Sequence, residues 1–148
     1  MKIVHIYSKP PYQYNKHTKT SIMKEILIIE DDIVMQFLLR NLFTEAGYTI
    51  KSIMDGKELF DNIDALSTDL IILDMMIPHI YDSSELINLY KDHEAPVVVV
   101  SSIDKEDGLY FSKKINAQAF FSKPFDSKEL LHKVNSLLHK ENNIVTNS

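Results

Sequence analysis

Short apolar runs alternate with amphipathic stretches along most of the chain after Lys24. The runs are rich in Val, Ile and Leu and predict β-strands at 25–30, 49–53, 69–74, 96–101 and 119–122. The stretches between them carry apolar residues at helical spacing and predict helices at 33–46, 56–64, 84–93, 105–115 and 127–140. Strands and helices that alternate through short loops are typical of a parallel sheet covered on both faces. We therefore predict an α/β fold with a doubly wound, five-stranded parallel sheet and five helices.

The first and last of these helices have the clearest local signals. An apolar stripe at a spacing of four runs along the first helix and consists of Val34, Leu38 and Leu42, with Phe37 alongside. Gly47 follows as a stop signal. The last helix opens with Asp126 and Glu129 at capping-box spacing. One side of that helix is apolar and consists of Leu130, Val134, Leu137 and Leu138.

The composition is that of an ordinary globular domain. The 148 residues are enough for one domain with a hydrophobic core. Cysteine is absent, which excludes disulfides and thiolate chemistry and fits a cytoplasmic location. The purely apolar runs are about four residues long, too short for a membrane-spanning helix.

The charge is unevenly placed. The net charge is −5, but residues 1–22 carry four lysines and no acidic residue, which leaves −9 on the rest of the chain when those four charges are subtracted. An acidic body argues against direct DNA binding. We interpret 1–22 as a poorly ordered basic extension, with a membrane- or RNA-binding arm as the alternative. We assign 23–140 to the domain and 141–148 to a frayed tail.

Polar residues terminate four of the five predicted strands. They are Glu30, Asp31 and Asp32 after the first strand, Asp74 after the third, Ser101 at the end of the fourth and Lys123 after the fifth. Ligands of doubly wound sheets bind at the carboxyl ends of the strands. We expect these side chains to converge on one edge of the sheet, except for Asp32, which we interpret as the cap of the first helix.

Carboxylates that meet at one edge repel each other. Two of them about 4 Å apart interact unfavourably by roughly 4 kcal/mol at an effective dielectric constant near 20. A divalent cation relieves this repulsion, and an all-oxygen cluster suits Mg²⁺. The neighbouring lysine and hydroxyl then fit a phosphoryl group, which an aspartate can accept covalently as an acyl phosphate.

Four motifs in chain order resemble the receiver domain of two-component response regulators: ILIIEDD, LIILDMMIP, PVVVVSS and FFSKPF. The resemblance covers about 24–140 and extends to the spacing between the motifs. It implies the flavodoxin-like strand order 2-1-3-4-5. It also implies a role for each matched residue.

Asp74 resembles the phosphoacceptor of this family. The implied Mg²⁺ ligands are Asp31 and Asp74 directly, Glu30 through a water molecule and the backbone carbonyl of Met76. The implied phosphoryl donor is a sensor histidine kinase or a histidine phosphotransfer protein.

Three further residues complete the implied switch. Ser101 corresponds to the hydroxyl that turns toward the phosphoryl group, and Lys123 to the ammonium that holds it. Phe120 matches the aromatic residue whose position changes on phosphorylation, and it lacks the hydroxyl of a tyrosine. The resemblance further implies a cis Lys123–Pro124 bond and a signal to a downstream protein partner through the 105–140 face.

Several positions depart from the family pattern. Asp82 and Asn116 stand where glycines are usual, and both residue types tolerate left-handed backbone. Met76 and Ile103 flank the path of the hydrolytic water in this family and are both apolar. We therefore expect slow autodephosphorylation.

The interpretation we favour is a stand-alone receiver, which is a phosphoacceptor with self-catalysed phosphotransfer and not an enzyme in the usual sense. One alternative is a pseudo-receiver, a protein-binding module that works without phosphorylation. Another is an aspartate-nucleophile phosphatase of the haloacid dehalogenase type. Such phosphatases have a D-x-D arrangement after one strand, and here Met76 occupies the second position.

Overall fold

The computed structural model describes residues 23–62, 67–79, 83–91 and 93–139. The predicted extension at 1–22, the tail at 141–148 and the atypical position Asp82 lie outside the described residues. None of the helices in the described part of the chain has the length and apolar content that crossing a bilayer requires.

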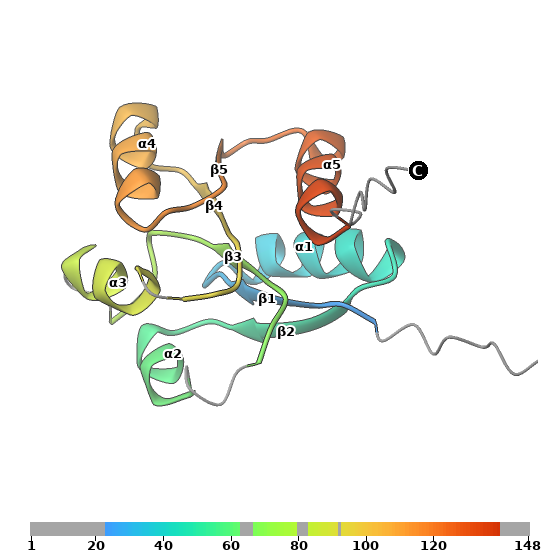
Figure 1. Cartoon of the computed structure of the whole chain (residues 1–148), viewed down its shortest axis with the longest axis horizontal. Coiled ribbons are helices and arrows are strands. Elements are labelled where there is room, and N and C mark those ends of the chain that lie inside the picture. The colour runs from blue at the N-terminus through green and yellow to red at the C-terminus, as the bar shows by residue number, and fades with distance from the viewer. Residues whose placement is uncertain (1–22, 63–66, 80–82, 92, 140–148) are drawn as a thin grey trace, which may run out of the picture.

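Five parallel strands form one sheet with the order β2-β1-β3-β4-β5. They are β1 (Glu25–Ile29), β2 (Thr49–Ile53), β3 (Leu70–Leu73), β4 (Val97–Ser101) and β5 (Ala119–Ser122). The order reverses direction between β1 and β3, where consecutive connections pass to opposite faces of the sheet (Figure 1). The predicted fold, including the strand order, is confirmed.

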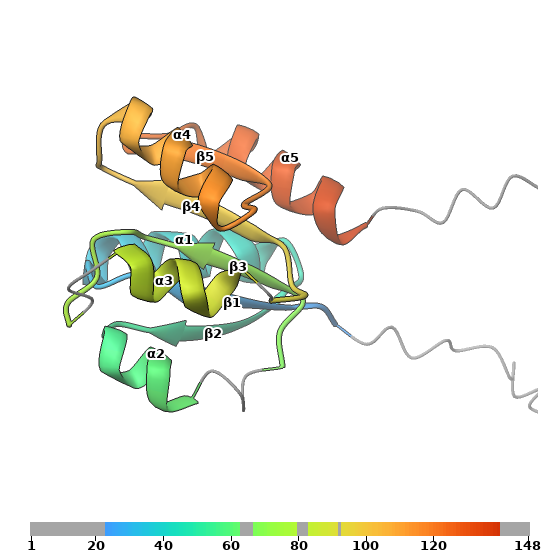
Figure 2. The ribbon, with the colours of Figure 1, turned by 60° about the vertical axis from the view of Figure 1, so that its left-hand side comes forward.

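Five helices cover the two faces of this sheet (Figures 1 and 2). They are α1 (Ile33–Glu45), α2 (Gly56–Asn62), α3 (Ser83–Tyr90), α4 (Lys105–Lys114) and α5 (Ser127–Leu138). The core is divided accordingly into two clusters of buried side chains. One cluster contains residues of α2, α3 and α4, and the other contains residues of α1 and α5.

The strands supply alternate residues to the two clusters. In β1, Leu27 and Ile29 pack under α2, α3 and α4, whereas Ile26 and Ile28 pack under α1 and α5. All four side chains are fully buried. Successive side chains of a strand point to opposite faces of the sheet, so a strand covered on both faces must be apolar throughout. This explains why β1, β3 and β4 lack the polar alternation of a half-exposed strand.

Helix α1 forms where it was predicted, but its buried face differs from the predicted stripe. Leu39 and Phe43 are fully buried, with Met35 and Leu42 packed beside their cluster. Of the predicted stripe, Leu42 is thus partly buried, whereas Val34, Phe37 and Leu38 are exposed, with 73% of the Val34 surface accessible. The helix is apolar around much of its circumference, so its periodicity does not single out the side that faces the sheet.

Among the described residues, three positions in turns have left-handed backbone. Gly47 has φ 92° and follows α1, as the stop signal predicts. Asn116 has φ 56° and precedes β5, where its short polar side chain tolerates this conformation. His79 has φ 64° and follows Pro78 in the loop after β3.

Candidate functional site

The carboxyl ends of the strands place the predicted polar residues at one edge of the sheet. The parallel ladder continues one residue beyond β1, β3 and β5, through hydrogen bonds from the backbone N–H of Glu30 to Ile53, of Asp74 to Ile29 and of Lys123 to Ser101. Ile29 and Leu73 are paired in register, so Glu30 and Asp74 leave neighbouring strands at the same level. The backbone thus holds these residues before any side-chain contact is considered.

Lys123 connects two buried carboxylates. Its Nζ lies 2.6 Å from Oδ2 of Asp74 and 2.7 Å from Oε2 of Glu30. The lysine side chain is 12% exposed, and the two carboxylates are less exposed still. Each buried acid therefore has the cation that its burial requires.

The other oxygen of Asp74 is also engaged. The Ser101 hydroxyl donates a hydrogen bond of 2.8 Å to Oδ1, and the backbone N–H of Met76 donates one of 3.0 Å to the same atom. Ser101 is fully buried. The carboxylate of Asp74 is thus held by three donors, which come from the loop after β3, from β4 and from the segment after β5.

Glu30 is fixed as firmly. Its Oε1 accepts a hydrogen bond from the backbone N–H of Asp32, and its own carbonyl accepts one from Gln36 of α1. Burial raises the pKa of Glu30 above its usual value of 4.5, although the hydrogen bond from Lys123 acts in the opposite direction. Burial acts to lower the pKa of Lys123, but the hydrogen bonds to Asp74 and Glu30 outweigh it and raise the pKa. Lys123 therefore stays cationic at neutral pH.

The acidic residues are close enough to share a cation. Carboxylate oxygens of Glu30, Asp31 and Asp74 all lie within 4.8 Å of one another, and Asp31 is exposed. Asp32 is not a member of this group, and its Oδ1 caps α1 by accepting hydrogen bonds from the backbone N–H groups of Val34 and Met35, each at 2.8 Å. The helix-cap interpretation of Asp32 is confirmed. Hard oxygen donors in this arrangement suit Mg²⁺.

These residues and their order along the chain decide the family. The response regulator receiver domain family matches residues 26–135. The chain belongs to this family. Receiver domains bind Mg²⁺ at an acidic pocket, and the acidic group of this receiver is the one that could hold such an ion.

Relatives and solved structures agree with this assignment. The transcriptional regulatory protein CpxR of Escherichia coli (strain K12) is 28% identical over 118 residues, which are 80% of this chain and 50% of CpxR. This receiver thus spans about half the length of CpxR. Sporulation initiation phosphotransferase F of Bacillus subtilis (strain 168) is 30% identical over 122 residues, 81% of this chain and 98% of the relative. A two-component response regulator from Clostridium difficile has the same fold, with a TM-score of 0.73, 21% identity and coverage of 81% of this chain and 99% of that structure.

The predicted site residues of this receiver fall into two groups. Glu30, Asp31, Asp74, Ser101 and Lys123 are brought together at the edge of the sheet. Met76 contacts this group through its backbone N–H, which donates a hydrogen bond to Asp74. Phe120 lies apart from them, half-buried in β5 opposite Val99. The Lys123–Pro124 bond is cis, as the family resemblance implies.

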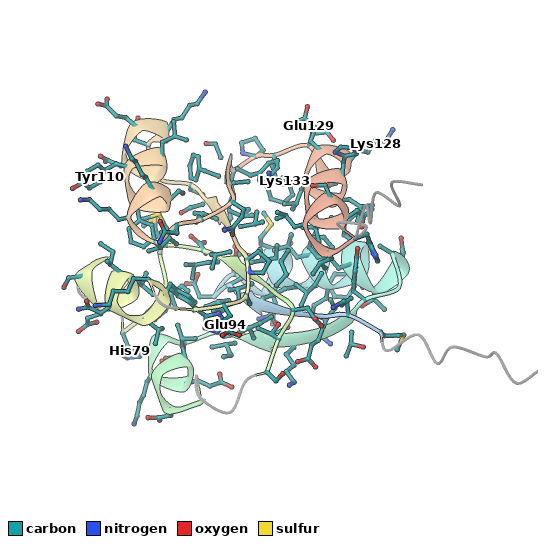
Figure 3. The ribbon with its side chains drawn as sticks, viewed as in Figure 1. His79, Glu94, Tyr110, Lys128, Glu129 and Lys133 are labelled. Atoms are coloured by element: carbon teal, nitrogen blue, oxygen red, sulfur yellow. The ribbon has the colours of Figure 1, made fainter. Side chains whose placement is uncertain are left out.

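A contact between Asp55 and His79 was not predicted from the sequence. His79 Nδ1 lies 2.6 Å from Oδ2 of Asp55 and connects the loop after β3 to the loop after β2 (Figure 3 labels His79). The N–H of Gly56 also donates to the carbonyl of Pro78. Hydrogen bonds from the backbone of Lys57 and from His79 lower the pKa of Asp55, against a smaller effect of burial. The adjacency of Asp55 to the end of the second predicted strand was the available signal.

Proposed function

We propose that this receiver is a phosphorylation-activated signalling switch that accepts a phosphoryl group on Asp74. One observation carries the proposal: Asp74 is a buried carboxylate held between Lys123 and Ser101, beside two further carboxylates. A solely structural aspartate would not need an acidic neighbour such as Asp31, whose charge opposes its own.

The transfer uses side chains that are already in place. An oxygen of Asp74 attacks the phosphorus of a phosphohistidine on a sensor histidine kinase or a histidine phosphotransfer protein. The new O–P bond forms as the N–P bond breaks, and the electron pair leaves with the imidazole. The ammonium of Lys123 stabilises the negative charge that gathers on the phosphoryl oxygens. Ser101 is near enough to donate a hydrogen bond to one of these oxygens.

Mg²⁺ is the cofactor that this donor set fits. Asp31 and Asp74 would bind the ion directly, with the backbone carbonyl of Met76. Glu30 would act through a water molecule, as the family resemblance implies; in the structure its carboxylate accepts hydrogen bonds from the backbone N–H of Asp32 and from Lys123. When bound, Mg²⁺ would offset the charge of the carboxylates and of the transferred group.

The output of the switch passes through α4, β5 and α5. Ser101 ends β4, and the neighbouring strand β5 carries Phe120, which pairs with Val99, two residues before Ser101. A shift of Ser101 toward a phosphoryl group changes the space available to Phe120, and with it the surface that a protein partner contacts. The similarity to a relative named a phosphotransferase supports a place in phosphoryl transfer between proteins.

A second candidate is a pseudo-receiver that binds proteins without being phosphorylated. It is favoured by the completeness of the hydrogen bonding at Asp74, since both carboxylate oxygens have donors from the protein itself. With these hydrogen bonds the carboxylate of Asp74 is stabilised without a phosphoryl group.

One experiment separates the candidates. The protein is incubated with Mg²⁺ and acetyl phosphate, and its intact mass is measured beside the variants Asp74→Asn and Asp69→Asn. Asp69 is the matched control. It directly precedes β3, at the opposite end of the strand from Asp74, and it pairs with Lys24. We expect one phosphoryl adduct in the wild type and in Asp69→Asn, and none in Asp74→Asn. The absence of an adduct in the wild type would support the pseudo-receiver, and continued release of inorganic phosphate would support a phosphatase.

A further inference from the structure

Gly108, in the middle of α4, faces the ring of Phe120 at very short range. A Cβ atom built on Gly108 would lie 2.3 Å from Cζ of Phe120, 2.4 Å from Cε2 and 2.9 Å from Cε1. Real Cβ atoms essentially never approach another heavy atom within 3.0 Å. The tip of the Phe120 ring therefore occupies the space that any other residue at position 108 would need for its side chain.

The backbone gives no other reason for this glycine. Gly108 is buried and donates an ordinary helical hydrogen bond of 2.8 Å to the carbonyl of Asp104. A glycine in a helix interior is unfavourable, because it orders a flexible backbone and adds no side-chain contact. Gly47 is the opposite case, with φ 92° and no atom within 4 Å of its added Cβ. Gly47 is needed for its backbone conformation, whereas Gly108 is needed for space.

The same ring borders a groove between α4 and α5. The groove has a volume of about 350 Å³ and is lined by Lys105 of α4, by Phe120 and Pro124, and by Glu129 of α5, among others. Figure 1 shows β5 between these two helices, and Figure 3 labels Glu129 on α5. The Phe120 ring thus lies between Gly108 of α4 and this groove.

We propose that Gly108 is the positioning residue that holds the Phe120 ring against α4 and thereby sets the resting state of the switch. Phe120 has no hydroxyl, so no hydrogen bond can favour one position, and shape must decide. The structure has the Ser101 hydroxyl turned toward Asp74 at 2.8 Å and the ring seated at Gly108 at the same time. Gly108 therefore biases the α4, β5 and α5 surface toward its signalling shape before phosphorylation. The link to signalling rests on the proposed function, whereas the seating of the ring does not.

A double-mutant cycle tests the seating of the ring. Gly108→Ala is made in the wild type and in a Phe120→Ala background, and the melting temperature of each protein is measured. Alanine normally stabilises a helix relative to glycine, so Gly108→Ala should raise the melting temperature when the ring is absent. In the presence of the ring we expect a smaller rise or a fall, because the ring must move or strain. Equal shifts in the two backgrounds would overturn the proposal.

The ring position is also read directly by NMR on protein labelled at phenylalanine. We expect nuclear Overhauser contacts between the Phe120 ring and Hα of Gly108 in the wild type. In Gly108→Ala these should be replaced by contacts to the side chains of Lys105 and Glu129. Contacts to residue 108 that persist unchanged in the variant would contradict the proposal.

The link to signalling has its own measurement, which is the rate of adduct formation with acetyl phosphate and Mg²⁺. We expect Gly108→Ala to slow the reaction about five-fold or more, the lower end of typical coupling between sites. An unchanged rate with a displaced ring would overturn the link while leaving the seating intact. A wild type that takes no phosphoryl group would refute both the proposed function and the link to signalling. The double-mutant cycle and the NMR contacts of the ring would still decide whether Gly108 positions Phe120.

Discussion

The ammonium of Lys123 lies 2.6 Å from Oδ2 of Asp74, although the two residues are 49 positions apart in the chain. The same nitrogen also contacts Glu30. One cation thus compensates two carboxylates that leave neighbouring strands, and the three side chains tie β1, β3 and β5 together at the edge where the site is found.

The first prediction concerns the loss of this cation. Lys123→Ala leaves two buried carboxylates facing each other, so we expect the free energy of unfolding to fall by about 3 kcal/mol when divalent cations are removed with EDTA. Urea unfolding measures the change. Lys24→Ala is the control, because it removes a more exposed lysine that pairs with Asp69 and should cost about 1 kcal/mol or less. An equal fall in the free energy of unfolding in the two variants would show that the burial of Lys123 and its partners does not increase the cost.

The second prediction concerns Mg²⁺. An ion that binds only the folded protein raises the free energy of unfolding by about 1.4 kcal/mol at ten times its dissociation constant. We expect this rise in the wild type, measured as a Mg²⁺-dependent shift in melting temperature, and its loss in Asp31→Asn. Asp32→Asn is the matched control, because asparagine caps a helix as well as aspartate does. Equal responses of the two variants would exclude Asp31 as a ligand.

The sheet and the site were predictable because both follow from local patterns. A continuous apolar run that stops at a polar residue marks the end of a buried parallel strand, and parallel strands end at one edge. Glu30, Asp74, Ser101 and Lys123 could therefore be placed together without any distance being known.

What escaped prediction depends on contacts between segments. Phe37 and Leu39 are equally apolar, and only the docking of α1 on the sheet decides that Leu39 is buried and Phe37 is 65% exposed. Asp55 and His79 make contact because the loop after β2 and the loop after β3 lie next to each other. Gly108 has no side chain, and only the structure shows that the Phe120 ring occupies the space beside its Cα.

The third prediction concerns the lifetime of the aspartyl phosphate. Met76 has 61% of its surface exposed beside Asp74, and neither it nor the half-buried Ile103 has a group that can orient a water molecule. Hydrolysis should therefore be slow, with a half-life of minutes or longer for the purified phosphoprotein after the donor is removed. Intact mass over time measures it, and Met76→Gln, which adds a hydrogen-bonding group, should shorten it. A wild-type half-life of seconds would contradict the prediction.

The fourth prediction concerns stability in acid. Burial acts to raise the pKa of Asp69, but hydrogen bonds from Lys24 and from the backbone of Glu25 outweigh it and lower the pKa below 3.8. An acid with a lowered pKa contributes stability at pH values above 3.8, and the contribution is lost as the pH falls through the lowered pKa. The difference in unfolding free energy between the wild type and Asp69→Asn should therefore be full at neutral pH and shrink in acid. A difference that grows in acid would contradict this assignment.

The fifth prediction compares two buried tyrosines. The Tyr90 hydroxyl has no hydrogen-bond partner among the described residues, and burial raises the pKa of this group. The Tyr48 hydroxyl donates to Oδ1 of Asn135 in α5 at 2.5 Å. Leaving a buried donor unpaired costs about 1 kcal/mol or more, and a satisfied hydrogen bond contributes about 1 kcal/mol. Tyr90→Phe should thus raise the free energy of unfolding and Tyr48→Phe should lower it, as measured by urea unfolding. A loss of stability in Tyr90→Phe would show that its hydroxyl is bonded in solution.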